Sequence, residues 1–111
     1  MIVVPQLIAR WLGTDRVTDF AERVAGRSRL AVWQRVLNRL PTLGPTEARG
    51  YLRARAVAVV REETERLVEQ EGAWVARHRV QIEDTALNML IQMILAQLDQ
   101  RRLQTGSRLA A

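Results

Sequence analysis

Apolar residues recur at intervals of three and four over the first forty positions of the chain, the spacing that puts side chains on one face of an α-helix. Glycine and proline interrupt this pattern, and a residue that commonly begins a helix stands at or near the start of each stretch. The sequence therefore predicts three short helices in this region. They are opened by Pro5, Thr14 and Ser28 and ended by Gly13, Gly26 and Pro41.

Residues 41–45 predict a loop, and Thr46 is expected to cap a long helix that reaches about Trp74. A strand over 57–60 is the competing interpretation, because valine favours sheets. Helix-forming Arg, Ala and Glu flank those valines without turn residues, so we favour the helix. We expect its second half, 62–71, to be a solvated acidic face.

Beyond Gly72, residues 76–79 predict a connection and residues 80–82 a short extended piece. The last helix is expected to begin near Glu83 and Asp84, because acidic side chains are favourable at the positive end of a helix dipole. The pattern as a whole predicts an all-α domain of about five helices, with a long central helix. We expect one domain over residues 1–104 and a flexible tail over 105–111.

The last helix is apolar around most of its circumference and leaves only a narrow polar line of Asn88, Gln92 and Asp99. Such a helix is buried on more than one side. Because a chain of 111 residues has a limited core, we expect a homodimer in which this helix meets a second copy. The alternative is a central core helix of a monomer. The candidate interface residues are Leu87, Leu90, Ile91, Ile94, Leu95 and Leu98.

Composition narrows the class of protein. The chain has no cysteine, which excludes disulfides and thiolate metal sites and fits a reducing, cytoplasmic compartment. Its longest uncharged stretch, 85–98, is shorter than the roughly 20 apolar residues that span a bilayer, so we expect no membrane segment.

Residues that carry chemistry are scarce. His78 is the only histidine, and no Glu-x-x-His pair accompanies the glutamates that share a face of the long helix, Glu62, Glu65 and Glu69. The two serines fall at a predicted helix cap and in the predicted tail, so they offer no nucleophile. We therefore expect no catalytic residue, no metal ligand, no cofactor and no enzymatic activity.

Charge is distributed unevenly along the chain. All 17 basic residues are arginine, and the formal net charge is +5. Residues 1–61 carry 11 Arg against four acids, whereas residues 62–111 carry 6 Arg against eight acids. A basic first half steers nucleic acid toward a protein, or pairs with an acidic second half across a fold or a dimer.

The segment Arg77-His78-Arg79-Val80-Gln81-Ile82-Glu83-Asp84-Thr85-Ala86-Leu87 resembles the link that follows the long helix in the histone-fold family. The helix order over residues 28–100 is also similar to that fold. The resemblance implies a dimer and phosphate contacts through Arg77 and Arg79, with Arg29, Arg49 and Arg53 as secondary contacts by position. The chain departs from the family in its loop 41–45, which lacks a basic residue, and in its two additional N-terminal helices.

Two functions follow as hypotheses. The first is a non-catalytic helical interaction or adaptor subunit that self-associates through its apolar C-terminal helix and binds a protein partner. The alternative is a basic, histone-like DNA-binding protein that contacts phosphates through its arginines.

Overall fold

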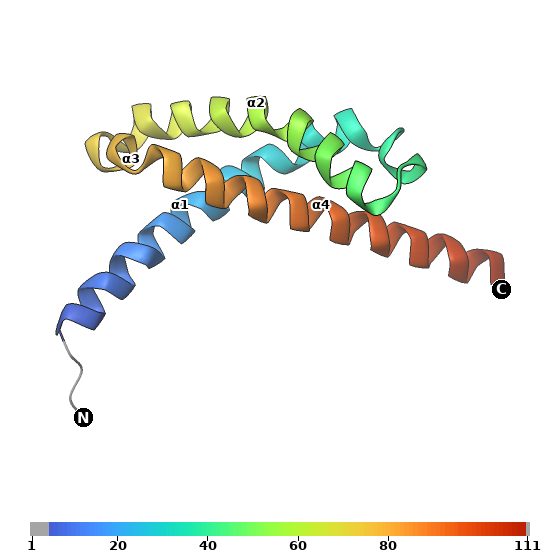
Figure 1. Cartoon of the computed structure of the whole chain (residues 1–111), viewed down its shortest axis with the longest axis horizontal. Helices are drawn as coiled ribbons and strands as arrows, with labels where there is room; N and C mark the ends of the chain where they lie inside the picture. Colours follow the sequence, from blue (N-terminus) through green and yellow to red (C-terminus); the bar gives the residue numbers. More distant parts are fainter. Residues whose placement is uncertain (1–4, 111) are drawn as a thin grey trace.

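Three long helices form the body of the molecule, and a one-turn helix closes one end (Figure 1). The structure is a computed structural model that describes the backbone of residues 5–110 and the side chains of residues 16–104. Within that backbone it contains four α-helices and no strand, so the all-helical prediction is confirmed with a smaller helix count. The elements are α1 (Pro5–Val36), the 3₁₀ helix η1 (Leu40–Thr42), α2 (Pro45–Glu71), α3 (Ala73–Arg77) and α4 (Arg79–Ala110).

Helix α1 is a single element, and the prediction of three short helices is wrong. It passes through both Gly13 and Gly26, which we expected to end helices. A glycine inside a helix costs about 1 kcal/mol relative to alanine. Burial outweighs that cost, because α1 packs against both α2 and α4 and buries residues on either side of Gly26, including Val24, Ala25 and Val32.

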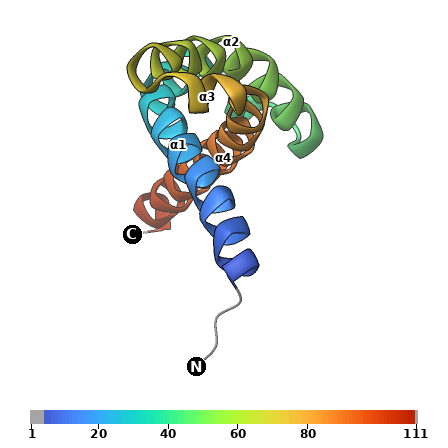
Figure 2. The same cartoon turned by 90° about the vertical axis from the view of Figure 1, so that its left-hand side faces the viewer.

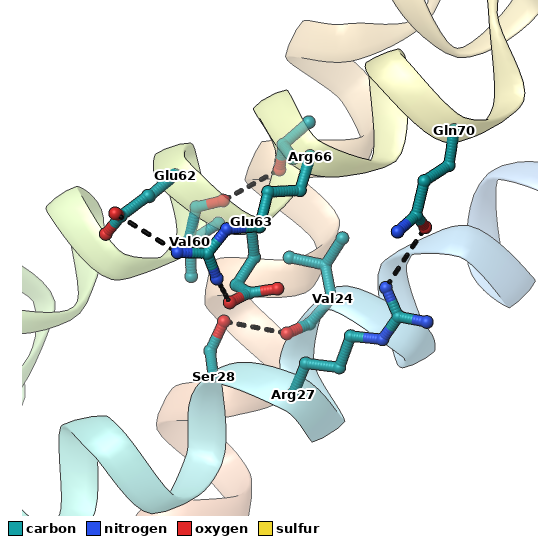
Figure 3. A network of polar contacts seen from close by, with 9 residues as sticks. Val24, Arg27, Ser28, Val60, Glu62, Glu63, Arg66 and Gln70 are labelled. Carbon is teal, nitrogen blue, oxygen red and sulfur yellow. Dashed lines mark hydrogen bonds and ion pairs between the residues drawn. The ribbon is translucent and has the colours of Figure 1, made fainter.

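Ser28 is not a helix cap but a buried residue inside α1. Its hydroxyl donates a hydrogen bond of 2.7 Å to the carbonyl oxygen of Val24 (Figure 3). Thr64 of α2 is buried in the same way and donates to the carbonyl oxygen of Val60 at 2.8 Å. Each hydroxyl is therefore satisfied within its own helix. Among the described side chains, no buried nitrogen or oxygen lacks a hydrogen-bond partner.

The turn between α1 and α2 is held by Leu40, which is fully buried at the start of η1. Gly44 takes the N-cap position of α2 and Pro45 its first helical position, where proline's missing N–H costs nothing. Thr46 is therefore inside the helix, and its predicted role as cap is wrong. The predicted loop 41–45 is partly ordered as η1.

Gly72 ends α2 and reverses the chain. Its φ of +85° is the one positive φ in the described backbone, a conformation that glycine adopts without the strain of a Cβ. Its N–H donates to the carbonyl oxygen of Val68 at 2.9 Å. The long helix therefore ends before Trp74, and Trp74 belongs to α3.

Helix α4 begins at Arg79, earlier than we expected. The predicted extended piece 80–82 is helical, because fully buried Ile82 lies four residues before buried Ala86 and extends the apolar stripe of α4 by one turn. Glu83 and Asp84 thus lie in the second turn. The backbone of α4 continues to Ala110; the side chains of 105–111 are outside the described part, and flexibility of this tail stays a prediction.

The helices pack as a triangle seen end-on (Figure 2). Helices α2 and α4 run side by side in opposite directions, while α1 crosses behind them, and α3 closes the end where α2 turns into α4. The first turns of α1 and the last turns of α4 extend past the bundle. With these ends included, the molecule measures 55 × 37 × 23 Å. None of the described helices is long and apolar enough to cross a membrane.

Two glycine substitutions test the continuity of α1 at Gly26 and the chain reversal at Gly72. Gly26→Ala is expected to raise the free energy of unfolding by about 0.5–1 kcal/mol, because Gly26 is helical and a Cβ there meets no atom within 4 Å. Gly72→Ala is expected to lower it by about 1 kcal/mol or more, because of the positive φ. Urea denaturation followed by circular dichroism measures both. If Gly26→Ala destabilised the protein, Gly26 would be a helix stop after all.

Candidate binding groove

The apolar residues predicted to form an interface belong to the core of the chain itself. Leu90 and Ile94 are fully buried, and no more than 7 % of any of Leu87, Ile91 and Leu98 is exposed. Leu95 is half-buried. Helix α4 packs against both α1 and α2, so most of these residues are buried without a second copy. Self-association is therefore not required by burial and stays a prediction.

Three of the five arginines predicted to contact nucleic acid lie on different helices. Arg29 projects from α1 and donates a hydrogen bond of 3.0 Å to the Gln97 side chain on α4. Arg77 is exposed in the last turn of α3. Arg79 forms ion pairs with Glu65 of α2 and Glu83 of α4. Arg29 and Arg79 are thus engaged by side chains of the molecule itself.

The acidic half of α2 is largely engaged in ion pairs within the molecule. Arg66 bridges Glu62 and Glu63 on the same helix (Figure 3), and Arg23 of α1 pairs with Glu71 at 3.2 Å. Over the side chains 16–104, no three carboxylate or histidine groups are clustered so that they could hold a metal ion. This face contributes to the docking of α1 on α2.

An aromatic cluster holds α3 against α1. Trp74 is half-buried and stacks on His78, with 4.1 Å between the ring centres, while the Arg16 guanidinium lies 4.1 Å from the Trp74 ring centre on α1's side. Phe20 adds a tilted contact at 5.6 Å. The His78 Nδ1 lies 2.9 Å from the Trp74 carbonyl oxygen, which only accepts, so Nδ1 carries the proton. The Trp11 side chain is outside the described residues.

The remaining two arginines, Arg49 and Arg53, line a groove along the outer seam of α2 and α4. Three hollows follow one another along this seam, and none of them is lined by a residue of α1. On α4 the seam runs from Val80 to Arg102, which is about 33 Å at the helical rise of 1.5 Å per residue. We refer to these three hollows together as the α2–α4 groove.

The two ends of the α2–α4 groove have apolar side walls with charged rims. The end near α3 is a hollow of about 180 Å³, lined by Val57, Val60, Arg61, Val80, Glu83, Asp84 and Leu87. The opposite end is a hollow of about 350 Å³, lined by Leu43, Pro45, Ala48, Arg49, Leu95, Leu98, Asp99 and Arg102. Val80 is 77 % exposed, an unusual position for a large apolar side chain of a core-facing helix.

The middle of the α2–α4 groove is polar and basic. Its hollow of about 330 Å³ is lined by Arg49, Gly50, Arg53, Asn88, Ile91 and Gln92, none of which is acidic. The Nη2 of Arg53 donates to Oδ1 of Asn88 at 2.9 Å and so links the two helices. The arginine pair thus faces the polar line of α4 across the seam.

Sequence reasoning identified the two arginines and the polar line but not their juxtaposition. Arg49 and Arg53 are one turn apart, as are Asn88 and Gln92, and both spacings are visible in the sequence. What pairs them is the antiparallel register of α2 and α4, which places residue 53 beside residue 88. A search for polar lines of matching length on two adjacent helices is the signal that finds such a groove.

Substitution of a buried residue of α4 tests whether that residue belongs to the core of the chain or to a dimer interface. Leu90→Ala is expected to lower the free energy of unfolding by about 2–5 kcal/mol, because the fully buried side chain leaves a cavity. Its mass by light scattering is expected to equal that of the parent protein at the same concentration. A variant that kept its stability but lost a dimer would place Leu90 at an interface instead.

Comparison with known proteins leaves the geometry as the basis for any statement about function. No protein-family model, curated protein or solved structure matches this chain. The resemblance to the histone-fold family therefore stays a prediction, and the segment on which it rested now lies in α3 and the start of α4.

Proposed function

We propose that this chain is a non-catalytic protein-interaction module, and that its α2–α4 groove takes up a helical segment of a partner protein. The observation that carries the proposal is the groove itself, with apolar walls at both ends and an arginine pair at its centre. A groove between two helices that lie side by side commonly binds an amphipathic helix, whose apolar face packs along the seam.

The exposed apolar atoms of the groove suit such a helix. Val80 is largely exposed and Val57 is half-buried at one end, while Leu95 is half-buried at the other. A partner helix placed along the seam covers these side chains and adds a fourth long helix to the bundle. The length of about 33 Å matches some six turns of helix.

A helical ligand fits this molecule better than an extended one. Extended peptides bind by adding a strand to the free edge of a sheet, and the described backbone contains no strand. In contrast, the two helices of the seam present side-chain ridges and hollows at helical spacing, into which the ridges of a third helix pack.

Nucleic acid is the competing ligand, because the chain is basic. Its arginines would have to contact several phosphates along one surface. Arg29 and Arg79 are instead directed to Gln97 and to Glu65 and Glu83, and Arg77 lies on another element. Two adjacent arginines are a small footprint for a duplex, which is why we favour a protein segment.

The proposal is tested by selecting helical peptides from a display library on the immobilised full-length chain. We expect the enriched sequences to have apolar residues at positions i, i+3, i+4 and i+7. Fluorescence anisotropy then measures the affinity of the selected peptides in solution. Enrichment of no helical peptide, together with a salt-sensitive gel shift on random duplex DNA, would favour the nucleic-acid alternative.

Substitution of one exposed apolar residue locates the binding surface. Val80→Gln is expected to weaken a selected peptide about fivefold, the effect of losing roughly 1 kcal/mol of apolar burial. Leu30→Gln is the matched control, because Leu30 is 65 % exposed on α1 and lies outside the groove. Equal effects of the two substitutions would contradict binding in the α2–α4 groove.

A further inference from the structure

The central hollow of the α2–α4 groove is lined mainly by hydrogen-bond donors. The guanidinium groups of Arg49 and Arg53 only donate. The side-chain oxygen of Asn88 already accepts a hydrogen bond from Arg53, which leaves its NH₂ group to donate. The amide of Gln92 supplies a further donor at the rim. The complementary ligand is therefore a group with several acceptor oxygens.

No acid lines this hollow beside its two arginines, whereas the adjoining hollow, which Arg49 also lines, contains Asp99. Arg23, Arg66 and Arg79 each pair with glutamate. Arg49 makes no hydrogen bond or ion pair with any side chain in 16–104, and no acid lines the central hollow. Like charges one helical turn apart repel each other. An anion held between Arg49 and Arg53 removes that repulsion.

Gly50 keeps the space between the two arginines open. It lines the hollow, and a Cβ built on it meets no atom within 4 Å. A helix-forming residue at this position would favour α2 by about 1 kcal/mol. A larger side chain there also occupies the room above the helix that a ligand group would fill.

We infer that the centre of the α2–α4 groove is an oxyanion subsite, in which Arg49, Arg53 and the side-chain amides of Asn88 and Gln92 bind a carboxylate or a phosphate group. The inference rests on the proposed function, because it makes this oxyanion an acidic or phosphorylated side chain at the middle of the partner helix. Guanidinium groups pair with both kinds of oxyanion through charge-assisted hydrogen bonds. The subsite then determines which helices the groove accepts.

The subsite is tested on the full-length ¹⁵N-labelled chain with inorganic phosphate and, separately, acetate, each replacing chloride at constant ionic strength. We expect saturable NMR shifts at the Gly50 amide and the Asn88 side-chain amide. Arg49→Gln/Arg53→Gln is expected to weaken binding at least about tenfold, the usual effect of losing a charge-assisted hydrogen bond. Shifts that rise linearly without saturation would mean an adventitious counter-ion only and would overturn the inference.

Two further variants separate a specific site from general charge. Arg35→Gln/Arg55→Gln makes the same change in net charge outside the groove, since Arg35 is exposed on α1 and Arg55 lies over the Tyr51 ring. This control is expected to bind the anions as the parent does. Gly50→Leu keeps every charge and fills the hollow, and it is expected to lose binding while remaining folded. An equal loss in the arginine control would overturn the inference.

Helical peptides that differ only at their central residue identify the natural source of the oxyanion. One carries glutamate, one phosphoserine and one glutamine, and the stronger of the first two indicates the group that the subsite selects. If all three bound equally well, the inference would be wrong but the proposed function would stand. If phosphate or acetate bound but no helical peptide did, the subsite would stand and the proposed function would fail.

Discussion

The free energy that stabilises this fold comes largely from the burial of α4, a helix whose apolar residues extend around most of its circumference. One neighbouring helix covers a single stripe, so α4 requires two. That requirement accounts for the length of α1, which continues through Gly26, and for the sharp reversal at Gly72, which returns the chain antiparallel to α2. Fully buried Ile82, Leu90 and Ile94 lie on the faces enclosed in this way.

The same requirement decides which side chains are left for binding. Once the apolar faces of α2 and α4 are committed to the core, their remaining polar residues meet on the outer seam. Arg53 and Asn88 are joined there by a hydrogen bond, and Arg49 is left without an acidic partner among the described side chains. Elsewhere the arginines neutralise acids between helices, as Arg23 does with Glu71. The central hollow differs from the two ends of the groove because it is lined by two arginines and no acid.

Much of the fold follows from local patterns in the sequence, and the failures have a common physical origin. Helical spacing predicted the long central helix and the apolar last helix, because those signals agree with the tertiary packing. Gly26 and Ser28 were misread as boundaries because local propensities of about 1 kcal/mol are weaker than the burial of the residues beside them. For the groove, Arg49 was identifiable from sequence, whereas its position opposite Gln92 depends on a helix register that no local pattern encodes.

Helix α4 follows α1 and α2 in the sequence, and this order matters during synthesis. Helices α1 and α2 leave the ribosome first, and both pack against α4 in the folded molecule. The apolar residues that they bury there have no complete cover until residues near Leu98 have emerged. During that interval the nascent chain exposes hydrophobic surface of the kind that chaperones recognise and that promotes aggregation. Folding is therefore expected to be a late, single step, completed only when nearly all of the domain has been translated.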